Sequence, residues 1–221
     1  MDAVLDNLGL FADGLAGTLT LFAWSAVGST VLGTLLAVMR VAPSSAVRAF
    51  ATTYVLGVRN TPLTVVFAFV VFGGPILGLA VGGDVELQYR VFAVIALTLY
   101  TSCFVCEALR GGIATVPVGQ AEAARSLGLT FGQSLRHVVL PQAGRTVVPP
   151  LGSVLIAMAK NTSIAAAFGN RELISAMRTG IENRGDAVVA VLVATAIAYL
   201  LVTLGLSLVF SLVERKVAIA R

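Results

Sequence analysis

The chain has 221 residues, of which 57% are hydrophobic and 12% are charged, and its formal net charge at pH 7 is +4. Soluble domains carry about 25% charged residues, so this composition excludes an ordinary soluble protein and indicates an integral membrane protein. The small positive charge does not indicate nucleic-acid binding, but it fits basic loops beside a membrane.

Five apolar segments approach the length of about 20 residues that a helix needs to cross a bilayer. They are expected at residues 14–39, 53–77, 90–109, 147–168 and 187–213. No repeat of these segments and no interdomain linker is visible, so residues 1–221 are expected to form a single all-helical transmembrane domain.

The N-terminus lacks the basic region that begins a signal peptide. Its first charged residues are Asp2, Asp6 and Asp13, which are all acidic. The first span is therefore expected to stay in the mature protein.

The first expected span carries small residues at every fourth position, namely Ser25, Ser29, Gly33 and Ala37. Positions four apart share one face of a helix, and a small face lets another helix approach closely in lipid. The sequence therefore predicts a tight helix–helix contact along this face. The second span is expected to kink at Pro62, because proline removes a backbone hydrogen bond.

Cys103 and Cys106 form a C-x-x-C pair inside the third expected span. Both lie in an apolar run, and His137 is the only histidine in the chain. We interpret the two cysteines as small buried residues one helical turn apart, and we expect no metal site.

The basic residues predict the orientation of the spans. One side of the membrane would hold nine of them: Arg40, Arg48, Arg110, Arg125, Arg136, Arg145, Arg215, Lys216 and Arg221. The other side would hold four: Arg90, Arg171, Arg178 and Arg184. The positive-inside rule then puts the N-terminus outside and the C-terminus in the cytoplasm. The polar segment 169–186 opposes this assignment, because its three arginines would lie outside.

Residues 119–141, GQAEAARSLGLTFGQSLRHVVLP, form the only long segment that is polar enough to lie in water. Its AEAARSL portion favours helix, Gly128 interrupts the helix, and a second amphipathic stretch ends at Leu140 and Pro141. The pattern of helix, glycine break and helix between two spans is typical of a docking loop. The positive-inside rule puts this loop in the cytoplasm.

At these positions the chain resembles a known family. Glu122-Ala123-Ala124, then Gly128, then Leu140-Pro141 match the spacing of the "EAA" loop of ABC importer permease subunits, with Val138 where the family usually has Ile. The flanks YTSCFVCEALRGGIATVPVGQ and PQAGRTVVPPLGSVLIAMAKNTS, and the block RNTPL at 59–63, are similar to the polar amino-acid branch. The resemblance covers the chain from about residue 17 to the end and is greatest to glutamate-importer permeases.

The resemblance implies a type I ABC importer permease fold with five transmembrane helices and a cytoplasmic coupling loop, in a bacterial plasma membrane. It implies two ABC ATPase subunits, a second permease subunit and an extracytoplasmic amino-acid-binding protein as partners. The residues that it assigns to contact with the ATPase are Gly119, Glu122, Ala123, Ala124, Arg125, Gly128, Leu140 and Pro141.

The chain has no motif for using ATP itself. A G-x-x-x-x-G-K-[ST] phosphate loop is absent, and the only lysines, Lys160 and Lys216, do not follow glycine-rich turns. The protein is therefore expected not to be an enzyme and to hold no cofactor. ATP and magnesium would be bound by the partner ATPase.

Three polar positions fall inside the expected spans. Lys160 lies near the middle of the fourth span, where a cation costs at least ~2.5–3.5 kcal/mol, and the polar residues Asn161-Thr162-Ser163 follow it. This favours a lined cavity; a snorkelling lysine or an ion pair with Glu107 is the alternative. Arg59 can bind a carboxylate or anchor at the interface. Glu107 can face the cavity or pair with Arg110.

The resemblance implies that Glu107, Lys160, Asn161 and Ser163 line a substrate site within the subunit. Asn161 stands where many members of the family carry Asp, which favours an acidic substrate such as glutamate. Lys160 and Arg59 would then take its carboxylates, and Glu107 its ammonium.

Two other classes of function stay open at this point. A secondary transporter or channel would work alone, but the chain has no inverted repeat and few intramembrane charges. A membrane anchor for a soluble enzyme would use the same loop, but it leaves Lys160 and Asn161 unexplained. Co-purification with an ATPase separates the importer subunit from both.

Overall fold

The computed structural model describes residues 7–217, and every regular element in this part of the chain is helical. The elements are α2 (Leu8–Met39), α3 (Ser45–Arg59), α4 (Leu63–Ile76), α5 (Val85–Ala114), α6 (Val118–Ser126), α7 (Phe131–Ser134), the π-helical turn η1 (Leu135–Val139), α8 (Leu140–Asn161), the 3-10 helix η2 (Thr162–Phe168), α9 (Leu173–Asn183), the 3-10 turn η3 (Gly185–Ala187) and α10 (Val188–Val217). Asp2, Asp6 and Arg221, on which the signal-peptide and orientation predictions partly rest, lie outside the described residues.

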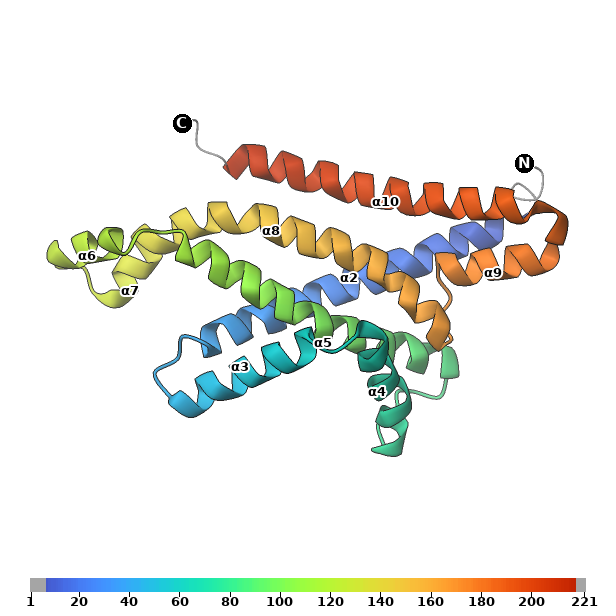
Figure 1. Cartoon of the computed structure of the whole chain (residues 1–221), viewed down its shortest axis with the longest axis horizontal. Coiled ribbons are helices and arrows are strands. Elements are labelled where there is room, and N and C mark those ends of the chain that lie inside the picture. Colours follow the sequence, from blue (N-terminus) through green and yellow to red (C-terminus); the bar gives the residue numbers. More distant parts are fainter. Residues whose placement is uncertain (1–6, 218–221) are drawn as a thin grey trace.

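The long helices α2, α5, α8 and α10 run roughly along the long axis of the molecule (Figure 1). Four segments in residues 7–217 are long and apolar enough to cross a membrane: Leu8–Met39, Val85–Ala114, Gly132–Phe168 and Gly185–Val217. The count reaches the expected five if α3 and α4 together form one broken span. α6 and α7 lie at one end of the long axis and α9 lies at the other (Figure 1).

The close helix contact predicted for the first span is confirmed. Ser25, Ser29, Gly33 and Ala37 are all buried on α2, whose main neighbour is α5. A Cβ at Gly33 would lie 2.6 Å from Cβ of Val105, so only glycine lets the two helices approach this closely.

The second expected span is broken rather than kinked. α3 ends at Arg59, α4 begins at Leu63, and the two helices differ in direction by 106°. Pro62 at the N-cap of α4 has no N–H to continue α3, and proline disfavours helical backbone at the residue before it. The kink predicted at Pro62 is thus a full break between two helices, and the expected continuous span over 53–77 is wrong.

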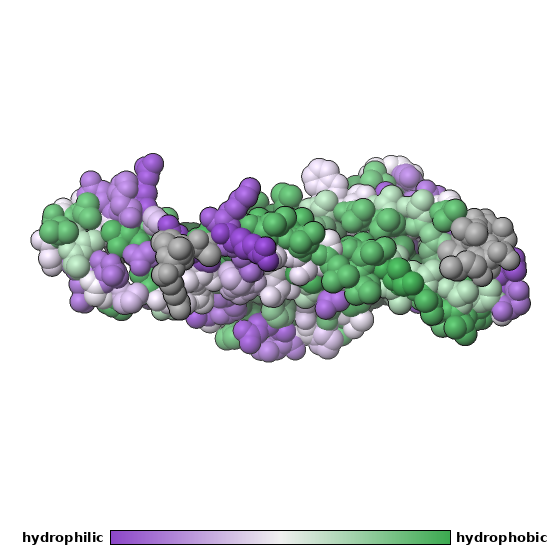
Figure 2. All heavy atoms as spheres, turned by 90° about the horizontal axis from the view of Figure 1, so that it is seen from above, coloured by the Kyte–Doolittle hydropathy of each residue, from purple (hydrophilic) through white to green (hydrophobic). Residues whose placement is uncertain are grey.

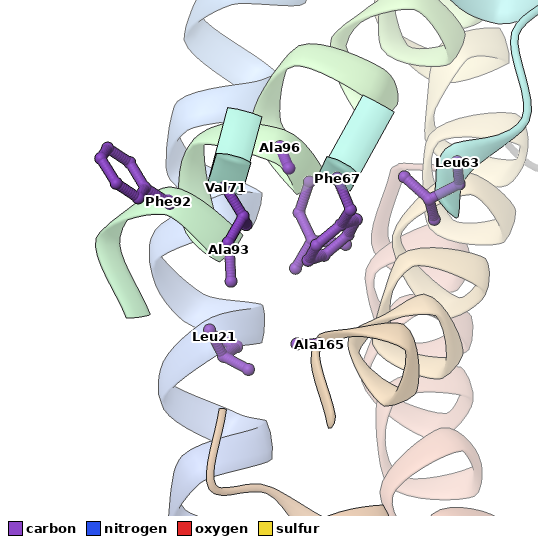
Figure 3. Packing of buried hydrophobic residues seen from close by; sticks show 9 residues of the cluster. Leu21, Leu63, Phe67, Val71, Phe92, Ala93, Ala96 and Ala165 are labelled. Atoms are coloured by element: carbon purple, nitrogen blue, oxygen red, sulfur yellow. The ribbon is translucent and has the colours of Figure 1, made fainter. Parts of the chain in front are cut away.

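α4 is held across the bundle by an apolar cluster. Phe67 and Val71 of α4 pack among Phe92, Ala93 and Ala96 of α5 (Figure 3). The ring of Phe67 also stacks on Phe168 of η2, with the ring centroids 5.2 Å apart. Burial of these side chains holds α4 across the bundle. A single straight span would instead have continued in the direction of α3.

The two cysteines are free and fully buried, as the sequence predicts. Cys103 and Cys106 pack in a second apolar cluster, against Ala51 and Val55 of α3 and Leu36 of α2. They join α5 to the hairpin of α2 and α3.

The fourth span begins earlier than expected. It was expected to begin at 147 with Pro149 and Pro150 in its first turn, but α8 begins at Leu140 and both prolines lie in its interior.

The polar segment 169–186 contains a helix, α9. This helix is amphipathic, and its residues Leu173, Ala176 and Gly180 are buried.

Candidate functional site

The first half of the loop at 119–141 has the predicted form, a helix followed by a glycine break, but the second stretch does not end at Leu140 and Pro141, because the helix that begins at Phe131 continues through η1 into α8. α6 follows Pro117, ends at Ser126, and is followed by Gly128 with φ of +84°, a left-handed conformation that favours glycine. The chain then turns into α7, which begins at Phe131. α6 and α7 extend beyond the long helices at one end of the molecule (Figure 1).

The residues of the EAA motif divide between the two faces of α6. Ala124 is buried, with 4% of its surface exposed. Glu122, Ala123 and Arg125 are exposed. Polar residues gather at and near this end, whereas apolar residues cover much of the middle of the long axis (Figure 2). One face of α6 thus packs inward, while the other carries an acid and a base on the surface.

Glu107 does not meet Lys160. Its carboxylate is held by the Arg40 guanidinium from the end of α2, and its Oε2 lies 3.6 Å from Nε of Arg110. α5 and α8 are antiparallel, and Gly112 packs directly on Val147. Counted from this contact, Lys160 lies roughly eight residues, or about 12 Å, beyond the level of Glu107. The ion pair of Glu107 with Lys160 is therefore contradicted, and the pairing with Arg110 is present.

Asn161 is the member of the predicted substrate set that lines a cleft. This cleft between α5 and α8 has a volume of about 370 Å³. It is lined by Tyr100, Thr101, Phe104, Ser153, Val154, Ala157, Met158 and Asn161. Its walls are mostly apolar, with a phenol, hydroxyls and one carboxamide as polar groups.

Lys160 and Ser163 flank the cleft without lining it. Lys160 is exposed at the last turn of α8 and makes no ion pair with any described residue. Ser163 is half-buried in η2. Arg59 is exposed at the end of α3, beside the break that separates α3 from α4. Of the predicted substrate set, only Asn161 lines the cleft, while Lys160 and Ser163 lie near it in sequence and Glu107 and Arg59 lie on other helices.

Glu172, which the sequence did not indicate as a site residue, is the least exposed carboxylate in residues 7–217. Glu172 is 0% exposed, and it lies at the N-cap of α9 in the connection that follows η2. Its Oε1 accepts from the Ser175 N–H at 2.9 Å, and its Oε2 accepts from the Tyr199 hydroxyl at 2.6 Å. Burial raises the pKa of this carboxyl above its ordinary value, although both hydrogen bonds act against the rise.

The signal for Glu172 was present but inverted. A capping box normally has Ser or Thr at the N-cap and Glu at the third helical position. Here Glu172 is the N-cap and Ser175 is the third position, so the usual search pattern does not find the start of α9.

Comparisons with known proteins agree with this geometry. Residues 29–219 match the family model described as binding-protein-dependent transport system inner membrane component. The chain is 41% identical over 210 residues to the glutamate transport system permease protein GluC of Corynebacterium glutamicum, covering 92% of both chains. It is 36% identical over 214 residues to the probable glutamine ABC transporter permease protein GlnM of Bacillus subtilis, covering 96% of this chain and 95% of that protein.

A solved structure shares the fold. A chain of the crystal structure of an amino acid ABC transporter with histidines superposes with a TM-score of 0.87 at 30% identity, covering 96% of both chains. The family match over most of the chain, the relatives and the fold agree with one another. The protein belongs to the family of binding-protein-dependent transport system inner membrane components, the permease subunits of ABC importers.

Proposed function

We propose that the chain imports a polar amino acid, with glutamate as the first candidate, as the permease subunit of an ATP-driven transporter. The observation that carries the proposal is α6, a short helix with the EAA spacing whose Glu122 and Arg125 are exposed at one end of a helical bundle. Glutamate is favoured because two relatives are named as glutamate and glutamate/aspartate permeases, at 41% and 30% identity. The chain acts as one transmembrane domain.

The energy comes from partners. The sequence has no phosphate loop, so ATP and magnesium bind to two ATPase subunits that contact α6. A second permease subunit, similar or identical, completes the pathway, and an extracytoplasmic binding protein delivers the amino acid. The α6 end faces the cytoplasm of a bacterial cell, together with the C-terminus, and the N-terminus lies outside.

The substrate passes beside the cleft between α5 and α8. Asn161 lines this cleft, and Lys160 is its neighbour in sequence. A lysine near the bilayer centre costs at least ~2.5–3.5 kcal/mol unless it meets water or an anion. Because Lys160 makes no ion pair with a described residue, a substrate carboxylate is the anion that we assign to it. Asn161 and Ser163 add neutral hydrogen bonds, and Arg59 binds a second carboxylate from the α3 side.

Glu107 is left out of the proposed site. Its carboxylate already meets the guanidinium groups of Arg40 and Arg110, so it has little capacity left for a substrate ammonium. In the transport cycle that we propose, closure of the ATPases on ATP moves α6, α6 moves α8, and the cleft opens to the outside. Hydrolysis reverses these movements.

Reconstitution of the complete complex in liposomes tests the proposal. The measurement is uptake of labelled glutamate and of labelled glutamine, with ATP on the ATPase side. Lys160→Ala is expected to lower glutamate uptake roughly tenfold or more, because a hydrogen bond to a charged group contributes ~1.5–3 kcal/mol. Lys216→Ala removes the only other lysine, at the end of α10, and serves as the matched control.

Two results would overturn the proposal. Uptake at the wild-type rate by Lys160→Ala would show that Lys160 does not bind the substrate carboxylate. Uptake by the chain without an ATPase, driven by an ion gradient, would instead establish a secondary transporter.

A further inference from the structure

The helix that links α7 to α8 is widened by one π-helical turn. In η1, the Leu140 N–H donates to the Leu135 carbonyl, five residues back, where an α-helix would use the carbonyl four residues back. Ser134 and Leu140, at the two ends of the turn, both have right-handed helical backbone. The helix therefore continues through the turn and is widened there, but it does not end.

Pro141 explains why the widening occurs at this position. Proline has no N–H, so Pro141 cannot donate to the His137 carbonyl, and its ring would press on that carbonyl in an ordinary α-helix. Beside it, Nε2 of Gln142 donates to the Val138 carbonyl at 2.9 Å, so this carbonyl of η1 has a side-chain donor. Pro141 thus removes a backbone donor that an α-helix would use, and Gln142 satisfies a carbonyl within the π turn.

Proline alone does not produce such a turn in this helix. Pro149 and Pro150 lie inside α8, and the backbone around them remains α-helical. Pro141 differs from them because it follows directly on η1, the turn against which α6 packs. π turns inside α-helices are frequent at functional sites.

The π turn sets how α8 is rotated relative to α6. One extra residue in a turn shifts the phase of the helix by the rotation of one residue, about 100°. The segment before the turn contacts α6, and the segment after it carries Ser153 and Asn161 into the cleft. An unbroken α-helix through Leu140 would therefore point these cleft residues in another direction for the same position of α6.

We propose that Pro141 and Gln142 are positioning residues for energy coupling, and that the π turn they maintain sets the angle at which α6 drives α8. The proposal rests on the proposed function of α6 as the ATPase contact. Pro141 acts through the backbone of η1, and Gln142 acts through the Val138 carbonyl, so neither needs to touch the ATPase or the substrate.

The experiment measures the number of glutamate molecules transported per ATP hydrolysed by the reconstituted complex. Gln142→Leu keeps the size of the side chain but removes its donor, and Pro141→Ala restores the N–H that an α-helix needs. Each change is expected to lower this ratio at least roughly fivefold, the lower end of typical coupling between sites. Pro149→Ala, a proline of the same helix outside the π turn, is the matched control and is expected to keep the wild-type ratio.

The outcomes separate this proposal from the one on which it rests. If wild-type complex shows no ATP-driven uptake, the proposed function itself fails. If wild-type complex transports and Gln142→Leu keeps its ratio, the role of the π turn is overturned, even where Pro141→Ala prevents assembly. A reduced ratio in Pro149→Ala equal to that in Pro141→Ala would likewise overturn it, because any helix proline would then have the same effect.

Discussion

The hydroxyl of Tyr199 donates to Oε2 of the fully buried Glu172 at 2.6 Å, and this contact joins α10 to the start of α9. The same start is bound to α2, because the Leu173 N–H donates to the Thr18 hydroxyl at 3.2 Å. α2, α9 and α10 therefore meet at the start of α9, where Glu172 is buried. This is the end of the bundle opposite α6 (Figure 1).

Tyr199→Phe is expected to destabilise the protein by about 1–3 kcal/mol, because it leaves a buried carboxylate oxygen without its donor. For a chain of this size, a loss of 1 kcal/mol lowers Tm by roughly 2–4 °C. The measurement is thermal unfolding of the purified chain in detergent. Tyr100→Phe is the control, since the Tyr100 hydroxyl makes no hydrogen bond with a described residue. Equal Tm values for the two variants would show that the contact contributes nothing.

The raised pKa of Glu172 predicts a pH dependence of stability. Below about pH 4.3, the ordinary pKa of Glu, the carboxyl is protonated in the folded and unfolded states. As pH rises through the folded pKa, the unfolded state releases its proton first, so this contribution to stability is lost. Wild-type protein should therefore lose stability relative to Glu172→Gln as pH rises above about 4.3.

Tm measured across this pH range for wild type, Glu172→Gln and the exposed control Glu182→Gln tests the sign. A difference between wild type and Glu172→Gln that grows in favour of wild type as pH rises contradicts the raised pKa. The control should follow wild type throughout.

Gly17→Ala is expected to separate α2 from the start of α9. A Cβ at Gly17 would lie 2.1 Å from the Arg171 carbonyl oxygen, so backbone must move, and overpacking of this kind costs about 1–3 kcal/mol. Gly9→Ala in the same helix meets nothing within 4 Å, and alanine favours helix by up to ~1 kcal/mol. Thermal unfolding should therefore give a lower Tm for Gly17→Ala than for wild type, and an equal or higher Tm for Gly9→Ala. A drop in both variants would assign the effect to the loss of glycine in α2 rather than to the contact.

The contact of Arg40 with Glu107 predicts energetic coupling between α2 and α5. The two side chains are 11% and 28% exposed, whereas those of Arg90 and Glu86, which also pair, are 35% and 38% exposed. A double-mutant cycle of Arg40→Gln and Glu107→Gln is expected to give about 0.5–3 kcal/mol, the range for residues in contact. The cycle of Arg90→Gln and Glu86→Gln should give less, about 0.3–0.5 kcal/mol, as for other exposed helix pairs. Additive effects of Arg40→Gln and Glu107→Gln on stability would show that the pair is uncoupled.

The long apolar segments predicted the long helices, because length and hydrophobicity are properties of a continuous segment. The small face at Ser25, Ser29 and Gly33 likewise predicted the α2–α5 contact, since spacing alone defines a helix face. The 106° turn after Arg59 could not be predicted in the same way. Its direction depends on where Phe67 is buried, against Phe168, which lies about a hundred residues away in the chain.

The charged residues show the same limit. Glu107 has one candidate partner in its own helix, Arg110, and spacing indicated it. Its other partner, Arg40, and the partner of Glu172, Tyr199, lie on different helices, so only the packing of the whole bundle identifies them. Lys160 is a candidate site residue from the sequence and from the structure alike, because a cation in an apolar span requires an explanation regardless of its neighbours.

The proposed import depends on contact between α6 and an ATPase subunit, and site-specific cross-linking in the membrane detects that contact. A photo-reactive cross-linker is attached at Glu122→Cys on the exposed face of α6, and at Leu77→Cys, an exposed position after α4, as the control. The native cysteines are fully buried and should not react. A cross-link to the ATPase subunit is expected from position 122 and none from position 77. Labelling of position 122 only by reagents added outside the cell, with no cross-link to an ATPase, would contradict it.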